Sequence, residues 1–504
     1  MNEKSFLPLV HGESVQRAAI PRLTVPSFRA AVIEAVSRGN RIAAFFGHPA
    51  ENNLVELIAV LADDARGALA TTSALAAETY PALTPDCPQA HWFEREIAEQ
   101  WAITPTGHPW LKPIRFHAPY SAGRKPCFPL AGPGLADYFQ VEGEEVHEVA
   151  VGPVHAGIIE PGHFRFQCHG ENVLHLEIEL GYQHRGIERR LRKAPDKKTI
   201  HYIETAAGDS TVAHATAYCN VLESLSSARL TAAVQIVRAI ALELERLANH
   251  AGDLGAMAGD VGFLPTAAYC GRIRGDWLNM TAMLCGNRFG RGLIRPGGAD
   301  YALGDAVITE LKSKLDAAER DTAGAVELLW QSGSVMARFE ETGVLNAHEA
   351  AALGLVGPPA RACGITRDVR QDFPSGIFRY AQIPVSTWQS GDVFARAFVR
   401  WLEIQRSIAF IREQLPMLGG GVKNSAVMAP LRPDAITAAL VEGWRGEICH
   451  VALTDSEGCF EHYKIVDPSF HNWFGLALAM RREQISDFPL CNKSFNLSYC
   501  GHDL

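Results

Sequence analysis

Several features that define common classes of protein are missing from this sequence of 504 residues. None of its eleven cysteines stands at C-x-x-C spacing from another, which argues against an iron–sulfur or zinc site built from neighbouring thiolates. No run of about 20 apolar residues lacks a charge, so the sequence predicts no membrane-spanning helix. The net charge is -9, and without clustered positive charge nucleic acid is not expected as the main partner.

One segment departs from this acidic balance. Residues Arg189–Lys193 read RRLRK, and Lys197 and Lys198 follow shortly after. Such a run is either a solvated helix face or a docking patch for an acidic partner, and the sequence leaves both interpretations open.

The N-terminus has no basic segment followed by an apolar one, so we expect the chain to stay in the cytoplasm. The turn at 152–162 is rich in glycine but lacks the G-x-G-x-x-G spacing of a dinucleotide-binding loop. Any nicotinamide chemistry would therefore belong to another subunit.

The length predicts two or three domains, and the overall pattern predicts an α+β fold. Residues 1–125 suggest a small α/β domain, with a helix at Ser27–Arg38 and a strand at Arg41–Phe46. Leu54–Leu61 is apolar enough for a further strand or another half-buried element. Proline and glycine gather before residue 135, which indicates a linker over 126–150.

The remaining segment, 151–504, predicts a large and mainly helical domain with short strands. Apolar residues recur at three- and four-residue spacing in four long segments, which favours packed helices. These segments are Ile200–Ser226, Leu230–Gly255, Asp305–Gly333 and Val393–Leu415. Strands are expected at Glu447–Leu453 and His462–Val466.

Several longer motifs, in order, resemble two related families of redox subunits. Two early motifs resemble the end of the 30 kDa-type subunit of respiratory complex I: Trp92–Ile97 (WFEREI) and Gly107–Leu111 (GHPWL). Four later ones resemble the complex I 49 kDa-type subunit and the large subunit of group 4 membrane-bound nickel–iron hydrogenases: Gly152–Arg165, Leu180–Glu188, Asn287–Gly298 and Gly443–Glu447. The fused order is similar to formate hydrogenlyase-type large subunits, and the motifs span nearly the whole chain.

The resemblance implies a large subunit of a membrane-associated oxidoreductase complex, peripheral to the inner membrane on its cytoplasmic side. The expected partners are a small iron–sulfur subunit and membrane-embedded antiporter-like subunits. The iron–sulfur cluster would lie in the partner, a quinone is a possible acceptor, and this chain itself would bind no cofactor.

The positions expected to carry nickel-binding cysteines differ from the hydrogenase pattern. The resemblance places Ala207 and Ser210 in the first ligand loop, and Ser498 and Gly501 in the second, with Cys500 one residue out of register. Neither a methyl group nor a hydroxyl replaces a soft thiolate. We therefore expect no metal at these positions and no active hydrogenase.

The resemblance also suggests where a quinone would bind. In the complex I relatives a histidine of the Gly-rich loop reaches toward the quinone, and either His155 or His163 corresponds to it. A tyrosine of those relatives is replaced here by Gly208. Asp209 beside it either handles protons or serves as an ordinary turn aspartate.

The motif at 180–188 contains further candidates. His184 and Glu188 are four residues apart, so a helix would place them on one face, as an ordinary helix pair or as part of a proton path. His214 belongs to the first ligand loop of the resemblance, where it either lines the pocket or ties the loop to its helix.

Arginines form the last group of candidates. Arg288, Arg291 and Arg295 either bind an acidic group or hold a neighbouring subunit through carboxylate pairs. Helix-packing polar contacts are expected from the four charged or titratable residues of the helix after Leu230: Glu243, Glu245, Arg246 and His250.

Two hypotheses remain open. In the first, the chain passes electrons or protons between an iron–sulfur partner and a membrane module, with His155, His163, Asp209, His184 and Glu188 at the site and Arg288 and His214 lining it. In the second, it is a redox-silent structural subunit of such a complex. The missing thiolates favour the second, and the retained inner loops favour the first.

Overall fold

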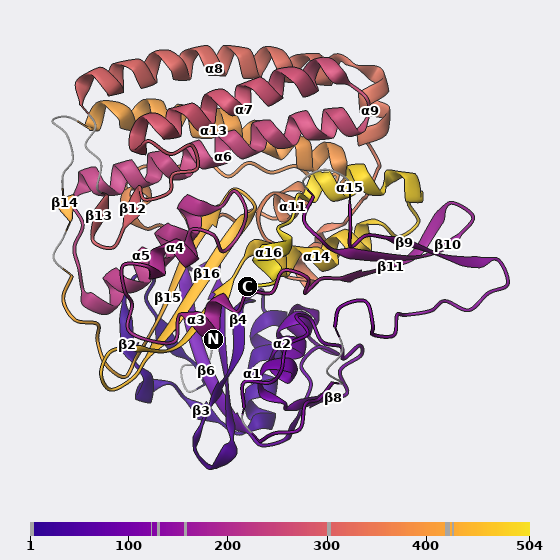
Figure 1. Ribbon diagram of the computed structural model, residues 1–504, viewed down its shortest axis with the longest axis vertical. Helices are drawn as coiled ribbons and strands as arrows, with labels where there is room; N and C mark the ends of the chain where they lie inside the picture. Colours follow the sequence, from indigo (N-terminus) through magenta and orange to yellow (C-terminus); the bar gives the residue numbers. More distant parts are fainter. Residues whose placement is uncertain are drawn as a thin grey trace.

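The computed structural model describes residues 5–121, 123–128, 132–155, 159–299, 304–418, 424–425 and 428–504. Figure 1 shows a layer of long helices on one side, antiparallel strands in the middle, and the N-terminal sheet with its helices on the other side. This mixture confirms the predicted α+β class. Residues 129–131 of the expected linker and 156–158 of the Gly-rich turn lie outside the described residues.

The N-terminal sheet has the order β1-β6-β5-β4, and β3 pairs in parallel with β6. Its strands are β1 (Leu7–Leu9), β3 (Arg22–Leu23), β4 (Arg41–Pro49), β5 (Val55–Asp63) and β6 (Ala68–Ala76). Helices α1 (Val25–Ser37) and α2 (His91–Trp101) pack against it. The predicted first helix and the strand at Arg41–Phe46 are thus confirmed within a few residues, and Leu54–Leu61 belongs to a strand.

A second antiparallel sheet has the order β17-β16-β15-β2. Its strands are β2 (Ser14–Gln16), β15 (Ala435–Gly443), β16 (Gly446–Thr454) and β17 (Phe460–Val466), which confirms both strands expected near the carboxyl end. Strands β15 and β16 are buried on both faces, because α5 covers one face and β4 approaches β16 and β17 from the N-terminal sheet. The two sheets therefore share one core.

The helical layer consists of α6 (Ala232–Asp260), α7 (Leu264–Cys285), α8 (Asp305–Gln331) and α13 (Val393–Gln414) (Figure 1). Local chemistry sets where two of them begin. The Thr231 side chain accepts a hydrogen bond from the Val234 amide at the start of α6, and Asp392 accepts one from Ala395 at the start of α13. The predicted helices at 230–255, 305–333 and 393–415 are confirmed. Among the described helices, none combines the length and the apolarity that crossing a bilayer requires.

The remaining predicted helix, over 200–226, is not continuous, so the prediction is wrong in the middle of this segment. The segment forms α4 (Thr199–Ile203) and α5 (Thr211–Ser226), separated by a loop. Asp209 in that loop has a left-handed backbone with φ of 59°, which no α-helix accommodates. The apolar spacing continues across the loop because Ala206 and Ala207 are buried there without being helical, so periodicity alone concealed the break.

Shorter elements complete the chain. A three-stranded antiparallel sheet contains β9 (Val146–Val151), β10 (His163–His169) and β11 (Asn172–Glu179). Strand β7 (Thr79–Pro81) pairs with β8 (Thr104–Thr106). Strand β13 (Gly298–Ala299) pairs on one side with β12 (Ile294–Arg295) and on the other with β14 (Asn424–Ser425). The short helices are α3 (Ile187–Arg190), α9 (Gly333–Phe339), α10 (Ala347–Ala352), α11 (Gly357–Ala362), α12 (Val369–Asp372), α14 (Pro468–Ala479), α15 (Phe488–Phe495) and α16 (Tyr499–His502).

Candidate functional site

Two loops that are almost 300 residues apart in sequence meet at one arginine. Arg445, in the turn between β15 and β16, donates from Nη1 to the Gly208 carbonyl (2.7 Å) and to Ser210 Oγ (3.2 Å). Its Nε donates to the Asn496 carbonyl (2.7 Å), just before the second loop. The guanidinium lies 3.9 Å from the centroid of the Trp444 ring. The contact between the two loops, here called the loop junction, is therefore fixed by the β15–β16 turn.

The side chains at the four expected ligand positions do not suit a nickel ion held by thiolates. Ala207 and Gly501 offer no side-chain donor. Ser210 Oγ accepts the Arg445 hydrogen bond, and Ser498 Oγ accepts one from the Gly501 amide (2.9 Å). Within the described part of the chain, no cluster of three or more His, Cys, Asp or Glu side chains is arranged to hold a metal ion.

The space beside position 501 is also filled. A Cβ atom on Gly501 would lie 2.7 Å from Cγ of Asp467, closer than side chains approach in proteins. Cys500, the adjacent thiol, is 3.3 Å from Ser498 Oγ, and burial raises its pKa to about 11. That thiol therefore stays protonated near neutral pH, which makes it a poor metal ligand.

The Gly-rich loop before β10 lies against the second loop. Glu160 accepts a hydrogen bond from the Tyr499 amide (3.0 Å). His155 Nε2 is 2.9 Å from the Gly162 carbonyl, and His163 Nδ1 is 3.0 Å from the Gly152 carbonyl, so both rings are bound within their own loop. The buried Nε2 of His163 has no hydrogen-bond partner among the described residues.

His184 and Glu188 do not share a helical face, so that prediction is wrong. Gly186, with φ of 65°, interrupts the backbone, and α3 begins only at Ile187. His184 Nδ1 binds the Asp503 carbonyl (3.0 Å), and burial lowers the pKa of this histidine to about 4. Glu188 instead pairs with Lys464 (3.0 Å) and accepts from the Ile465 amide (2.9 Å).

A groove of about 870 Å³ opens beside the first loop. It is lined by arginines, histidines and tyrosines: His117, Tyr120, His184, Arg185, Arg189, Arg190 and Tyr202. Arg185 reaches from it to the carbonyls of Thr205 (2.6 Å) and Ala206 (2.8 Å). Arg189 lies over the Tyr120 ring and Arg190 over the Tyr202 ring, so part of the basic run flanks a concave surface.

The Asp209 side chain lies beside α7. Its carboxylate lies 3.3 Å from Arg274, while its carbonyl accepts hydrogen bonds from Trp444 Nε1 (2.8 Å) and Asn249 Nδ2 (3.1 Å). Beside it, Glu245 accepts from the amides of Val212 (2.6 Å) and Ala213 (3.3 Å) at the start of α5. This side chain thus anchors the first amides of the helix that follows the first loop, although burial raises its pKa to about 8.

Arg288 lines a small cavity together with Asp209 and Glu245. Arg288 and Arg291 are exposed, whereas Arg295 is half-buried. The structure therefore places Arg288 near the first loop, and whether the three arginines act on one acidic group stays a prediction.

His214 is part of a continuous buried chain of polar groups. Its Nε2 lies 3.0 Å from an Asp467 carboxylate oxygen, and its Nδ1 lies 3.1 Å from His450 Nε2. His450 Nδ1 is in turn 2.9 Å from the Tyr463 hydroxyl. All four side chains are at most 1% exposed, and they join α5, β16, β17 and the residue before α14.

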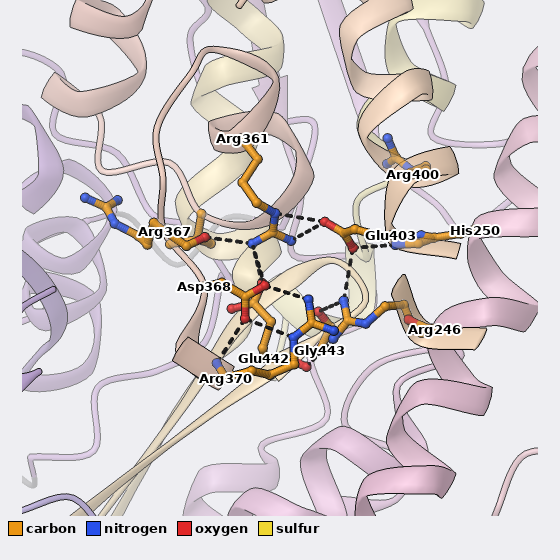
Figure 2. A network of polar contacts seen from close by, with 12 residues as sticks. Arg246, His250, Arg361, Arg367, Asp368, Arg370, Arg400, Glu403, Glu442 and Gly443 are labelled. Carbon is orange, nitrogen blue, oxygen red and sulfur yellow. Dashed lines mark hydrogen bonds and ion pairs between the residues drawn. The ribbon is translucent and has the colours of Figure 1, made fainter. Parts of the chain in front are cut away.

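Figure 2 shows a second buried network, which we call the α6 network, behind the β15–β16 turn. It contains three arginines, four carboxylates and a histidine: Arg246, Arg361, Arg370, Glu243, Asp368, Glu403, Glu442 and His250. Arg246 donates to the carbonyls of Glu442 (2.7 Å) and Gly443 (3.1 Å). The network confirms that Glu243, Arg246 and His250 make packing contacts, and it holds the turn that presents Arg445.

Several of these residues were missed by sequence reasoning. Arg445 lies in the motif Gly443–Glu447, which carried part of the family resemblance, but the motif did not predict that its side chain would join the two loops. Asp467 precedes Pro468 and accepts from the Ser469 amide (2.8 Å), the pattern of a helix N-cap, which gives no hint of its contact with His214. His450 and Tyr463 lie in predicted strands, and nothing in the sequence predicted which side chains they would contact.

Comparison with known proteins gives the family. Residues 42–130 match the family described as respiratory-chain NADH dehydrogenase, 30 Kd subunit, and residues 260–435 match the 49 Kd subunit. The chain is 30% identical to the carbon monoxide-induced hydrogenase of Rhodospirillum rubrum over 351 residues, which are 69% of this chain and 97% of that relative.

Two further relatives are a formate hydrogenlyase subunit and an NADH-quinone oxidoreductase subunit. Formate hydrogenlyase subunit 5 of Escherichia coli (strain K12) is 27% identical over 439 residues, covering 84% of this chain and 77% of the relative. NADH-quinone oxidoreductase subunit 4 of Thermus thermophilus is 28% identical over 369 residues, which cover 68% of this chain and 90% of that relative. The chain belongs to the family of complex I 49 kDa-type subunits and related hydrogenase large subunits, here fused to a 30 kDa-type segment.

Proposed function

We propose that this chain is the hydrogenase-like large subunit of a membrane-associated oxidoreductase complex, related to complex I, that works without a nickel–iron centre. It couples electron transfer to the movement of protons or other ions. The observation that carries the proposal is the loop junction, which Arg445 and the α6 network hold in place although the expected ligand positions are Ala207, Ser210, Ser498 and Gly501.

The proposed partners rest on the resemblance to subunits of complex I-like complexes. A small iron–sulfur subunit supplies the cluster that this chain does not bind, and antiporter-like subunits embed the complex in the membrane. The chain lies at the cytoplasmic face of the inner membrane and touches the bilayer only through those partners. The groove with Arg189 and Arg190 supports a contact with an acidic surface, because neither side chain has an ion-pair partner among the described residues.

A quinone-like molecule is the proposed acceptor. His163 supports this role, since its buried Nε2 has no partner and faces no competing hydrogen bond from the described part of the chain. Asp209 is retained as a proton-handling group, because its carboxylate is part-exposed beside Arg274. His184 and Glu188 are each held by fixed contacts, so their proposed role is to position the loops.

The absence of nickel is tested on the purified complex by elemental analysis. We expect nickel far below one ion per chain, because two of the four expected ligand positions have no side-chain donor. Nickel close to one ion per chain would refute this part of the proposal.

Electron transfer is tested by following quinone reduction by the complex, with His163→Ala and His155→Ala. We expect His163→Ala to lower kcat/KM roughly tenfold or more. His169→Ala is the matched control, because His169 ends the same strand but is exposed and pairs with Glu145. Unchanged turnover in both loop variants would dismiss the quinone site, and a lack of turnover with any donor would favour the redox-silent structural role.

A further inference from the structure

A second groove lies beside the β10–β11 hairpin, and we call it the hairpin groove. Its volume is about 520 Å³, and it is lined by three residues of β11 and two arginines that lie just after α14: Asn172, Val173, Leu174, Arg481 and Arg482. Figure 1 shows this sheet at the edge of the molecule. The hairpin groove shares no lining residue with the groove beside the first loop, so it can hold a different ligand.

Backbone hydrogen bonds fix the two arginines beside the strand. The Arg482 amide donates to the Val173 carbonyl (2.8 Å), and the Val173 amide donates to the Glu483 carbonyl (2.9 Å). Asn172 and Gln484 form an antiparallel bridge next to them. The segment after α14 therefore runs along the edge of β11, and one wall of the groove is held against the other.

Two irregular backbone positions lie in this groove. The register between β10 and β11 shifts between Gln167 and Cys168, which leaves Leu174 as an extra residue of β11. Such a bulge redirects a side chain, and Leu174 is 41% exposed. Arg482 has a left-handed backbone with φ of 70°, which is uncommon for a residue with a side chain. Deviations of this kind cost energy and concentrate at functional sites.

The groove also carries positive charge. Arg481 and Arg482 are exposed, and neither forms an ion pair with a residue that the structure describes. Burial and the charge of Arg481 lower the pKa of His175, although Glu177 acts in the opposite direction. That glutamate is bound to Lys112 (2.6 Å). Two guanidinium groups therefore remain for an anion that comes from outside the chain.

These features indicate the chemistry of the ligand. Arginine binds carboxylates through paired hydrogen bonds, so two adjacent arginines suit a ligand with carboxylate groups. Leu174 adds an apolar surface between the strand and the arginines. A short peptide segment that combines aspartate or glutamate with an apolar residue matches both features.

An anionic membrane surface matches the groove less well. Val146, His169 and Asn172 are adjacent across the sheet, so the exposed Glu144 and Glu145 lie at the same end of the sheet as the groove. A flat anionic surface would meet these glutamates, and lipid-binding surfaces gather about four to eight basic residues. A narrow segment reaches the arginines without meeting the glutamates.

We propose that the hairpin groove is a docking site for an acidic segment of a partner subunit, which places carboxylates on Arg481 and Arg482 and an apolar side chain on Leu174. That a partner subunit exists rests on the proposed function. The position and the charge of the contact rest on the groove itself.

Photo-crosslinking in the complete complex tests the contact. A photoreactive p-benzoylphenylalanine replaces Leu174, the membranes are irradiated, and the complex is purified. We expect a cross-link to one partner subunit, within a segment that contains aspartate or glutamate. Tyr269 is the matched control position, because it is an exposed aromatic residue of α7 outside the groove. The same photoreactive residue at position 269 should not label that segment.

Charge reversal tests the role of the arginines. In Arg481→Glu/Arg482→Glu we expect the recovery of the cross-linked subunit with this chain to fall roughly tenfold or more, because like charges then face each other. Arg229→Glu/Arg320→Glu is the matched control, since both arginines are exposed and without an ion-pair partner among the described residues. It changes the net charge equally and should leave the recovery unchanged. Arginine in place of the cross-linked carboxylate should restore binding to the reversed groove.

Several results would overturn the inference. These are a cross-link only to lipid, to a second copy of this chain or to a basic segment, the lack of any cross-link from position 174, and equal recovery with the reversed arginines and with the control pair. If the reversed arginines prevent folding, the cross-link made with both arginines in place still decides.

Failure of the proposed function would look different. The unmodified chain would then be recovered without any partner subunit, and the docking site would fall with it. A complete complex that tolerates the reversed arginines would overturn the docking site alone.

Discussion

At the scale of single residues, Glu442 shows the effect of burial on a carboxyl group. Burial raises its pKa to about 7, although Arg361, 2.8 Å away, acts in the opposite direction. The folded pKa exceeds the ordinary value of 4.5, so the folded chain binds more protons than the unfolded one between these two pH values. The resulting stabilisation, about 3 kcal/mol, is present below pH 4.5 and is lost as the pH rises through 7.

Glu442→Gln is therefore expected to reduce the pH dependence of stability. The amide imitates the protonated carboxyl, so the melting temperature of the variant should change less between pH 5 and 8 than that of the unmodified chain. Thermal unfolding at several pH values measures this. A variant whose melting temperature falls as steeply with rising pH would show that another group is responsible.

Glu403 is expected to behave in the opposite way. Arg361, His250 and Arg246 surround it, and although burial alone would raise its pKa, these partners hold that pKa well below its ordinary value. Glu403→Gln would leave buried cations without their counter-charge, at a cost of about 3 to 5 kcal/mol. Chemical unfolding at pH 7 checks this against Glu327→Gln, an exposed glutamate of α8. Equal losses in both variants would contradict the argument.

At the scale of secondary-structure elements, two glycines fix the β15–β16 turn against α11. A Cβ on Gly357 would lie 2.2 Å from the Arg445 carbonyl and 2.5 Å from the Gly446 Cα. Both glycines also have positive φ, 68° and 132°. The backbones are thus in direct contact, and this contact helps to set the direction of Arg445.

Gly357→Ala is expected to displace the turn and lower the free energy of unfolding, on the order of 2 kcal/mol or more. In contrast, Gly324→Ala in the exposed part of α8 meets no atom within 4 Å and should be neutral or stabilising. Unfolding in urea compares the two variants. A Gly357→Ala chain as stable as the Gly324→Ala chain would show that the turn adapts.

Elements were predictable to the extent that their signals are local. The apolar spacing of Asp305–Gln331 and of Val393–Gln414 identified α8 and α13 with nearly correct ends. The break before α5 was not predictable, because it depends on the left-handed Asp209 and on Glu245, which binds the first amides of α5 from another helix. The same holds for the candidate site. Its loops were predictable from their sequence motifs, whereas the roles of Arg445, Asp467 and His450 depend on contacts between segments far apart in the sequence.

At the scale of the whole molecule, a buried ion pair connects the two main sheets. Arg41 at the start of β4 pairs with Glu447 in β16, and both side chains are 1% exposed. Asp64 joins them, 2.9 Å from Arg41, and also accepts from Arg367 (2.6 Å). The N-terminal and C-terminal segments are therefore linked by charge as well as by apolar packing.

Arg41→Met is expected to destabilise the chain by about 3 to 5 kcal/mol, because Glu447 keeps its buried charge without this partner. The double variant Arg41→Met/Glu447→Gln removes that charge and should be more stable than Arg41→Met alone. Thermal unfolding of the unmodified chain, both single variants and the double variant forms a double-mutant cycle. Additive losses would mean that the pair contributes nothing as a pair.

The close approach of Asp467 to Gly501 limits which residues position 501 can hold. A cysteine introduced there would collide with the Asp467 carboxyl, and moving that carboxyl would detach His214 and the first turn of α14. A thiolate site engineered between the two loops would therefore require a substitution at Asp467 in addition to those at the ligand positions.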